Sequence, residues 1–213
     1  MSYDEKTKKT SISWYEHDTK TTETKTYDKT IVAVPFSVAR LWRLPKFNPI
    51  IKEAITGLGY SYACKVSVSM TLFCASFAAD IVPSQLLYKT RFWEHIEQPI
   101  FGGCGSTDLP GIGSVCYPAY NINGTGPGAL LASYTTPVGP SLSALSEADH
   151  VGMVVEAMNE IHGEIAAEQY TGEYDRVCWG LDPNQAGSWA SPYTGQHERY
   201  MPEYHRTHLN HIL

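Results

Sequence analysis

The chain has 213 residues, of which 43% are apolar and 18% are charged, and its formal net charge is −6. This length and composition are those of a globular protein with a sizeable core, built as one large domain or two small ones. The negative net charge argues against a nucleic-acid partner, because a surface that follows phosphates needs an excess of basic side chains.

The first part of the chain predicts strands followed by short helices. Its Lys- and Thr-rich start mixes both charges and predicts a solvated hairpin edge that includes the strand "SISWYEH". The run "KTIVAVP" is nearly all apolar and predicts a strand buried on both faces, which ends at Pro35. "FSVARLWRL" predicts a short helical turn, and "PIIKEAITGLG" predicts a second helix with one apolar face.

The middle of the chain predicts an antiparallel sheet. Strands are expected around Lys65, around Phe92, at "VCYPAY" and at "ALLASYTTP", because Gly- and Pro-rich turns separate these runs. The clearest helix is expected at residues 147–161, where Ser146 caps an apolar stripe. A last strand, "YDRVCWGL", follows. Together these elements predict an α+β fold with a mixed or antiparallel sheet and flanking helices.

The cysteines are widely scattered along the sequence. No CxxC pair indicates a zinc or redox motif, so we expect free, buried thiols. The charged first ten residues predict no signal peptide, and the compartment, cytoplasmic or secreted, stays open. Asn123 opens the glycosylation sequon "NGT", which matters only in a secreted protein. The five cysteines are Cys64, Cys74, Cys104, Cys116 and Cys178.

Several local motifs carry little function by themselves. "NGTGPG" lacks a following Gly-Lys-Ser/Thr and helix, so a hairpin turn explains it. His205, His208 and His211 share a spacing that brings them near one helical face, but no carboxylate or cysteine completes a site, and we predict no metal. In "CWGLDPNQAGSWASP" two tryptophans flank a turn, which fits either core packing or one wall of a flat-ligand pocket.

Five ordered stretches resemble the second half of flavin-dependent amine oxidases, and most of all microbial and fungal L-amino acid oxidases. They are "YDKTIVAVPFSVARLWRLP", "YACK…YKTRFWE", "IFGGCGSTDLPGIGSVCYP", "GPGALLASYT" and "CWGLDPNQAGSWASPYTGQ". Five blocks in order across nearly the whole chain are far more specific than any single block. The resemblance implies flavin-domain strands and a turn at 1–45, a substrate domain at 46–178, and the start of a C-terminal flavin-binding segment at 179–213.

The resemblance also implies roles for individual residues. Lys65 resembles the lysine that holds a water near flavin N5, and Tyr117 the tyrosine that binds the substrate carboxylate. Trp179 resembles the tryptophan that packs on the flavin ring system, and Trp189 the residue that lines the pocket over the flavin. A packed core side chain is the alternative at each position, and at Lys65 a lysine that extends along the sheet to solvent.

The implied cofactor is FAD, and the implied substrates are an L-amino acid and oxygen. The family oxidises the substrate to an imine, which hydrolyses to a keto acid and ammonia, and oxygen leaves as hydrogen peroxide. Hydride removal from an amine carbon needs an uncharged amine over the flavin in a dry, aromatic-walled slot. A simple amine is the alternative substrate. A homodimer is expected for the full-length parent, and neither a membrane nor a nucleic acid is implied.

The sequence lacks several elements of that family. No G-x-G-x-x-G is present to bind the FAD pyrophosphate at a helix N-terminus. The family's carboxylate-binding arginine and its closing Gly-Glu flavin segment are also missing. We therefore expect a C-terminal half without its Rossmann half, inactive as an isolated chain, whose apolar "IVAVP" edge is left bare. The alternatives are a non-catalytic α+β binding module and an inert product of a broken gene.

An apolar run at 68–85 interrupts the "YACK…YKTRFWE" block. Removing it restores the family's spacing between Lys65 and the Phe-Trp pair. Val-Ser at its start can be encoded as GTAAGT and Gln at its end as CAG, the consensus edges of an intron. We interpret 68–85 as a retained intron translated in frame. A genuine insertion is the alternative, whereas Asp80, Pro83 and the short length argue against a membrane segment.

Overall fold

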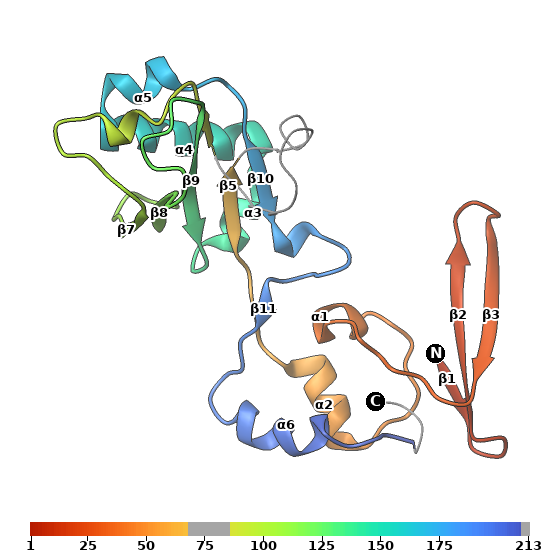
Figure 1. Cartoon of the computed structure of the whole chain (residues 1–213). Helices are drawn as coiled ribbons and strands as arrows, with labels where there is room; N and C mark the ends of the chain where they lie inside the picture. Colours follow the sequence, from red (N-terminus) through yellow and green to blue (C-terminus); the bar gives the residue numbers. More distant parts are fainter. Residues whose placement is uncertain (68–85, 210–213) are drawn as a thin grey trace. The chain divides into compact units, whose positions relative to one another are not determined.

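The computed structural model describes residues 1–67 and 86–209 (Figure 1). The run 68–85, interpreted above as a retained intron, lies outside the described residues, as do Cys74 and His211. The chain divides into two compact units. The terminal unit comprises Met1–Ser61 and Asp182–Leu213, and the sheet unit comprises Tyr62–Leu181. The domain boundaries expected at residues 45 and 178 stay a prediction.

The terminal unit begins with a three-stranded antiparallel sheet of order β1-β2-β3. Hydroxyl pairs cross β2 and β3, for example Ser11 with Thr26 at 2.8 Å, and most side chains there are exposed. The predicted solvated hairpin is therefore confirmed. The elements of this unit are β1 (Ser2–Asp4), β2 (Lys9–Glu16), β3 (Thr21–Tyr27), α1 (Phe36–Ala39), α2 (Pro49–Gly57), β4 (Tyr60–Ser61), β11 (Trp189–Ala190) and α6 (Gln196–Tyr204).

The core of the terminal unit lies between α2 and α6. The Asn48 side chain accepts a hydrogen bond from the Ile51 amide at 3.0 Å and so caps α2, which confirms the helix predicted at "PIIKEAITGLG". The apolar face of α2 packs against Tyr200 of α6. The strand predicted at "KTIVAVP" is wrong. Residues 31–35 pair with no described strand, and Ile31 is 75% exposed, because no neighbouring strand here supplies backbone partners.

The sheet unit holds an antiparallel sheet of order β10-β5-β9-β8-β7, and β6 pairs with β9 as well. This arrangement of sheet and helices confirms the predicted α+β class. The elements of this unit are β5 (Cys64–Ser67), β6 (Leu86–Tyr88), η2 (Phe92–Glu94), β7 (Gly103–Ser106), β8 (Ser114–Tyr117), β9 (Gly128–Thr135), α3 (Gly139–Ala144), α4 (Glu147–His162), α5 (Glu164–Gln169), β10 (Asp175–Cys178) and η3 (Trp179–Leu181).

The two faces of this sheet differ in burial. On one face, here called the helix face, the strand side chains pack against α4, which crosses behind β9 and β5 in Figure 1. On the other, the Lys65 face, Lys65, Leu131, Tyr134 and Val177 are half-buried. Alternate residues of one strand point to opposite faces, so register decides which residues meet. The helix-face core includes Val66, Val115, Leu130, Ala132, Val151, Val154 and Met158.

Helix α4 confirms the clearest prediction from the sequence. The Ser146 hydroxyl accepts a hydrogen bond from the Asp149 amide at 3.1 Å, as an N-cap does. The helix ends at His162, where Gly163 follows with a φ of 75°. The apolar stripe of α4 packs against the side chains on the helix face of the sheet.

The segment after β6 is not the strand that the sequence predicts around Phe92. It forms the 3-10 helix η2, and Arg91 and Glu94 are each only 3% exposed. The two form a buried ion pair, and Glu94 also accepts from the Asn123 amide at 2.7 Å. Arg91 donates a second hydrogen bond to the Pro118 carbonyl at 3.2 Å. These partners compensate the cost of removing both charges from water.

The prediction of free thiols is wrong for four of the five cysteines. Cys64 in β5 lies opposite Cys178 in β10 and bonds to it, with the Cα atoms 4.1 Å apart. Cys104 in β7 bonds in the same way to Cys116 in β8, with Cα atoms 4.0 Å apart. The register of the paired strands places the two cysteines of each bond opposite each other. The spacing of the cysteines in the sequence does not show this register.

Candidate functional site

Three side chains meet on the Lys65 face of the sheet unit. The Lys65 Nζ lies 4.5 Å from the ring centroid of Tyr134 and 4.9 Å from that of Trp179. Lys65 stands opposite Tyr134 in the β5–β9 ladder, and Trp179 follows the last residue of β10. The sheet therefore brings together two residues that the sequence predicts as functional, Lys65 and Trp179, and adds Tyr134.

The charge of Lys65 is held by aromatic faces. Among the described residues no carboxylate forms an ion pair with Lys65. The electron-rich faces of Tyr134 and Trp179 attract an ammonium group instead. Burial lowers the pKa of Lys65, because desolvation disfavours its charged form. The site is thus a half-buried ammonium donor beside flat aromatic surface.

Two glycines allow close packing next to Tyr134 and Trp179. Gly113 has a φ of +72°, and a Cβ on it would lie 2.6 Å from the Tyr134 carbonyl oxygen. Gly180 follows Trp179, and a Cβ there would lie 2.8 Å from the Tyr62 ring. A larger residue at 113 would displace the backbone of Tyr134, and one at 180 would displace the Tyr62 ring beside Trp179.

Tyr117 lies on the helix face, away from this cluster. Its hydroxyl is hydrogen-bonded to His162 Nε2 at 2.8 Å, and its ring contacts Trp93 with centroids 6.1 Å apart. Burial raises the pKa of Tyr117 to about 12 and lowers that of His162. Its neighbour Cys116 is the residue that β8 places on the Lys65 face. The carboxylate-binding role expected for Tyr117 stays a prediction.

Trp189 belongs to the terminal unit, where β11 pairs it with Ser61 of β4. Its side chain is 43% exposed. Its expected place in the wall of the flavin pocket stays a prediction.

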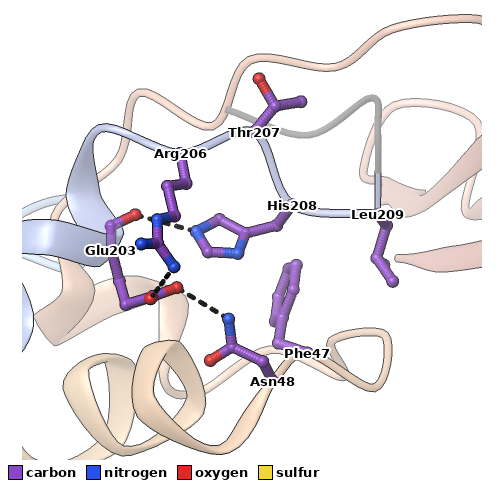
Figure 2. A pocket seen from close by; sticks show the side chains of 7 residues that line it. All are labelled: Phe47, Asn48, Glu203, Arg206, Thr207, His208 and Leu209. Carbon is purple, nitrogen blue, oxygen red and sulfur yellow. Dashed lines mark hydrogen bonds and ion pairs between the residues drawn. The ribbon is translucent and has the colours of Figure 1, made fainter.

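The terminal unit contains a cavity of about 220 Å³ around Glu203 (Figure 2). The buried Glu203 carboxylate accepts from Asn48 Nδ2 at 2.7 Å and from Arg206 Nη1 at 2.8 Å. His208 Nε2 lies 3.0 Å from the Glu203 carbonyl oxygen. These polar groups are hydrogen-bonded to one another and connect α6 with the start of α2. We therefore interpret the cavity as part of the packing between the two helices and not as a binding site. Its lining comprises Phe47, Asn48, Glu203, Arg206, Thr207, His208 and Leu209.

Neither a metal cluster nor a membrane span is found in the part of the chain that the structure describes. No three or more His, Cys, Asp or Glu side chains gather there around a position for a metal ion. None of the helices in 1–67 and 86–209 combines the length and apolar character needed to cross a bilayer.

Comparison with known proteins identifies the class. Residues 78–211 match the sequence profile of the flavin containing amine oxidoreductases. The chain is 42% identical to an L-amino-acid oxidase of Neurospora crassa over 99% of its own length and 29% of the relative's. It is 28% identical to the putative L-amino-acid oxidase YobN of Bacillus subtilis, over 83% of this chain and 33% of that protein. The chain belongs to the flavin-containing amine oxidoreductase family and spans about a third of the length of these relatives.

Solved structures of the same class share the fold. Putrescine oxidase bound to putrescine superposes with a TM-score of 0.62 and 18% identity, covering 89% of this chain and 37% of the other. Cyclohexylamine oxidase from Brevibacterium oxydans gives a TM-score of 0.64 and 11% identity, covering 99% and 40% of the two chains.

The Lys65 cluster fits a flavin ring system. Trp179 offers a half-buried flat ring, and Leu131 and Val177 on the same face offer apolar surface. Lys65 supplies a hydrogen-bond donor with few competing partners. The sequence holds no glycine-rich phosphate-binding motif, so the described residues would hold the ring portion of the cofactor and not its pyrophosphate.

Tyr134 is the residue of this cluster that the sequence does not single out. The alternation in "GALLASYT" predicts a strand, but it does not say which strand lies beside it. The neighbour of Tyr134 is fixed by the β5–β9 pairing, between segments about 70 residues apart in the chain.

Proposed function

We propose that this chain is the substrate-side part of an FAD-dependent L-amino acid oxidase. The observation that carries the proposal is the Lys65 ammonium beside the Trp179 ring, 4.9 Å from its centroid, on one face of the sheet. The 42% identity to the Neurospora crassa oxidase supports an amino acid as substrate. The reaction converts an L-amino acid to an imine, which water hydrolyses to a keto acid and ammonia, while oxygen becomes hydrogen peroxide.

The residues of this chain position groups and exclude water, and bound FAD supplies the acceptor for the hydride. With the cofactor bound, Lys65 would donate a hydrogen bond to a water at the flavin edge. Trp179 would form a flat wall against the ring system, and for Trp189, in the terminal unit, we retain the family role of a pocket-lining residue. These apolar walls keep the amine uncharged and the site dry. For Tyr117 we retain the family role of binding the substrate carboxylate, which competes with its hydrogen bond to His162.

A chimera tests this function. The chain, with and without residues 68–85, replaces the matching segment of the Neurospora crassa relative, and FAD content and peroxide release are measured with a panel of L-amino acids. We expect peroxide with at least one amino acid, and slower flavin reduction or reoxidation for Lys65→Met with substrate binding nearly unchanged. A chimera that holds FAD but oxidises no amino acid contradicts the proposal.

The isolated chain gives a second test. We expect it to bind no stoichiometric FAD and to release no peroxide, since the motif for the pyrophosphate is missing from its sequence. A flavin spectrum at one FAD per purified chain contradicts this expectation.

Oxidation of a simple amine is the second candidate. It is favoured by the fold match to putrescine oxidase and cyclohexylamine oxidase, with TM-scores of 0.62 and 0.64. The same chimera separates the two candidates, because peroxide with amines and none with amino acids selects the second.

A further inference from the structure

Lys65 touches two aromatic rings, and the family resemblance gives a role to only one of them. The Trp179 ring is assigned to the flavin, whereas Tyr134 has no assigned role. Yet the Tyr134 ring is the nearer of the two, at 4.5 Å against 4.9 Å from the Lys65 ammonium. Tyr134 also stands directly opposite Lys65 in the ladder between β5 and β9, where cross-strand side chains are in contact.

We propose that Tyr134 is a positioning residue for Lys65, whose ring face holds the ammonium in place on the Lys65 face of the sheet. The proposal rests on the catalytic role given to Lys65 above. Tyr134 acts through Lys65 and is not assigned any contact with flavin or substrate.

A ring holds a lysine differently from a carboxylate. A carboxylate partner takes up N–H donors of the ammonium and raises its pKa. An aromatic face attracts the charge without accepting a directed hydrogen bond, so the donors stay available for a water. A lysine on a flexible four-carbon stem also needs a fixed contact if it is to present one orientation. Tyr134 meets both needs. Its ring contacts the ammonium and fixes its position, and the N–H donors stay free of a carboxylate, since no described carboxylate pairs with Lys65.

The backbone of Tyr134 is held firmly. Its amide donates to the Ile112 carbonyl at 3.1 Å, and it pairs with Ser114 of β8 on the side opposite Lys65. Gly113 packs so closely that a Cβ there would lie 2.6 Å from the Tyr134 carbonyl oxygen. The ring therefore projects from a strand that is paired on both sides, and its position relative to Lys65 is set by the sheet.

The first test uses the isolated chain and needs no flavin. Lysines are dimethylated with ¹³C-formaldehyde, the Lys65 signal is assigned by its loss in Lys65→Arg, and its pKa is titrated by NMR. We expect Tyr134→Leu, which keeps apolar bulk but removes the ring, to lower the pKa of Lys65 by about half a unit. Tyr134→Phe keeps the ring and is the matched control, for which we expect no shift. Equal pKa values in the Leu and Phe variants overturn the proposal.

A second series guards against misfolding of Tyr134→Leu. Phenylalanines with increasing numbers of ring fluorines, introduced at 134, weaken the negative ring face while hardly changing its size. We expect the pKa of Lys65 to fall stepwise with fluorination, with the circular dichroism spectrum unchanged. A flat response overturns the proposal even if the leucine variant does not fold.

The final test separates this proposal from the proposed function. In the chimera described above, we expect Tyr134→Leu to slow the flavin step that Lys65 supports by about threefold, with KM unchanged, and Tyr134→Phe to restore it. A chimera that holds FAD but is inactive refutes the oxidase function and leaves the pKa result in the isolated chain standing. An active chimera that is indifferent to Tyr134→Leu refutes the positioning role alone.

Discussion

The two faces of the sheet in the sheet unit differ: one forms the core with α4, and the other carries the candidate site. On the helix face, Val66, Leu130 and Ala132 are 0% exposed and pack against α4. On the Lys65 face, the same strands present Lys65 and Tyr134 half-buried, with an ammonium between rings. One residue along a strand separates a core position from a candidate catalytic one. The register of the strands, more than the type of residue, therefore separates structure from chemistry here.

The contrast is clearest at two residues that the family resemblance treats alike. Both are expected in the active site, Lys65 near flavin N5 and Tyr117 at the substrate carboxylate. The structure puts Lys65 on one face and hydrogen-bonds the Tyr117 hydroxyl to His162 on the other. Each prediction below challenges that division, beginning with the largest expected effect.

The first prediction compares two cations: Arg91, which is buried over the ring of the core residue Trp93, and Lys65 on the Lys65 face. Arg91→Met leaves Glu94, 3% exposed, as an uncompensated charge, and we expect a loss of about 3–5 kcal/mol of unfolding free energy. Lys65→Met removes a half-exposed cation that has no described ion-pair partner, and we expect a change below about 1 kcal/mol. Chemical denaturation of both variants measures the difference. Equal losses contradict the division between the faces.

The second prediction concerns His150, which is 0% exposed on the helix face. Its Nδ1 accepts from Arg176 Nε at 2.9 Å, and burial, with the nearby Arg176 charge, lowers its pKa from 6.5 to about 4. The unfolded chain therefore binds a proton more readily. Stability from this group is complete above pH 6.5 and falls by up to about 3 kcal/mol as the pH drops toward 4.

Urea unfolding at pH 7 and pH 4.5 measures this loss. His150→Gln is the control, because its amide oxygen can still accept from Arg176 but does not titrate. We expect the pH dependence of the variant to be shallower than that of the parent chain. Parallel curves for the two proteins mean that His150 does not carry the acid sensitivity.

Local signals in the sequence predict much of this fold. The Ser146 cap and apolar stripe locate α4, and the Asn48–Pro49 start locates α2. Pairings between distant segments are not visible in the sequence. The Cys64–Cys178 bond spans 114 residues of chain, and no local pattern predicts it.

In the candidate site too, local patterns are visible in the sequence and contacts between distant segments are not. Lys65 and Trp179 are identified because their neighbouring residues resemble a known family. Tyr134 is missed because only the β5–β9 register makes it a neighbour of Lys65. The burial of the Arg91–Glu94 pair is missed as well. Arg91 donates to the Pro118 carbonyl and Glu94 accepts from the Asn123 amide, and both contacts form only in the folded loop.

The third prediction tests where Tyr117 acts. If its hydroxyl serves the helix face, Tyr117→Phe breaks the hydrogen bond to His162, and we expect a loss of about 1 kcal/mol of unfolding free energy. A double-mutant cycle with His162→Gln measures the coupling by chemical denaturation. In the chimera, a rise in KM for amino acids without any loss of stability would instead support the carboxylate-binding role and move Tyr117 to the site.

The last prediction concerns the interrupted strand line beside β9. Val66 of β5 stands opposite Ser133, and Leu86 of β6 stands opposite Leu130, so their partners in β9 are only three residues apart. On the other side, β10 pairs with β5, and the preceding residues bond to β6, as when the Leu87 amide donates to the Glu173 carbonyl at 3.3 Å. Two continuous neighbours run past both strands. β5 and β6 therefore lie in line, as two parts of one strand between β9 and the β10 side of the sheet. The first part precedes 68–85 in the chain and the second follows it.

We therefore expect deletion of 68–85 to leave the fold of the sheet unit almost unchanged and to raise soluble yield and protease resistance. The deletion also tests the assignment of residues to the two faces. A shift of β5 by one residue in its pairing with β9 would turn Lys65 toward α4. Non-reducing peptide mapping reports the register of β5, since the Cys64–Cys178 bond requires those residues to stay opposite each other. The pKa of Lys65, titrated as above, reports whether it still faces the rings. Loss of that disulfide or unfolding of the shortened chain would show that 68–85 is a genuine part of the protein, and transcripts lacking GT and AG at its edges would exclude an intron.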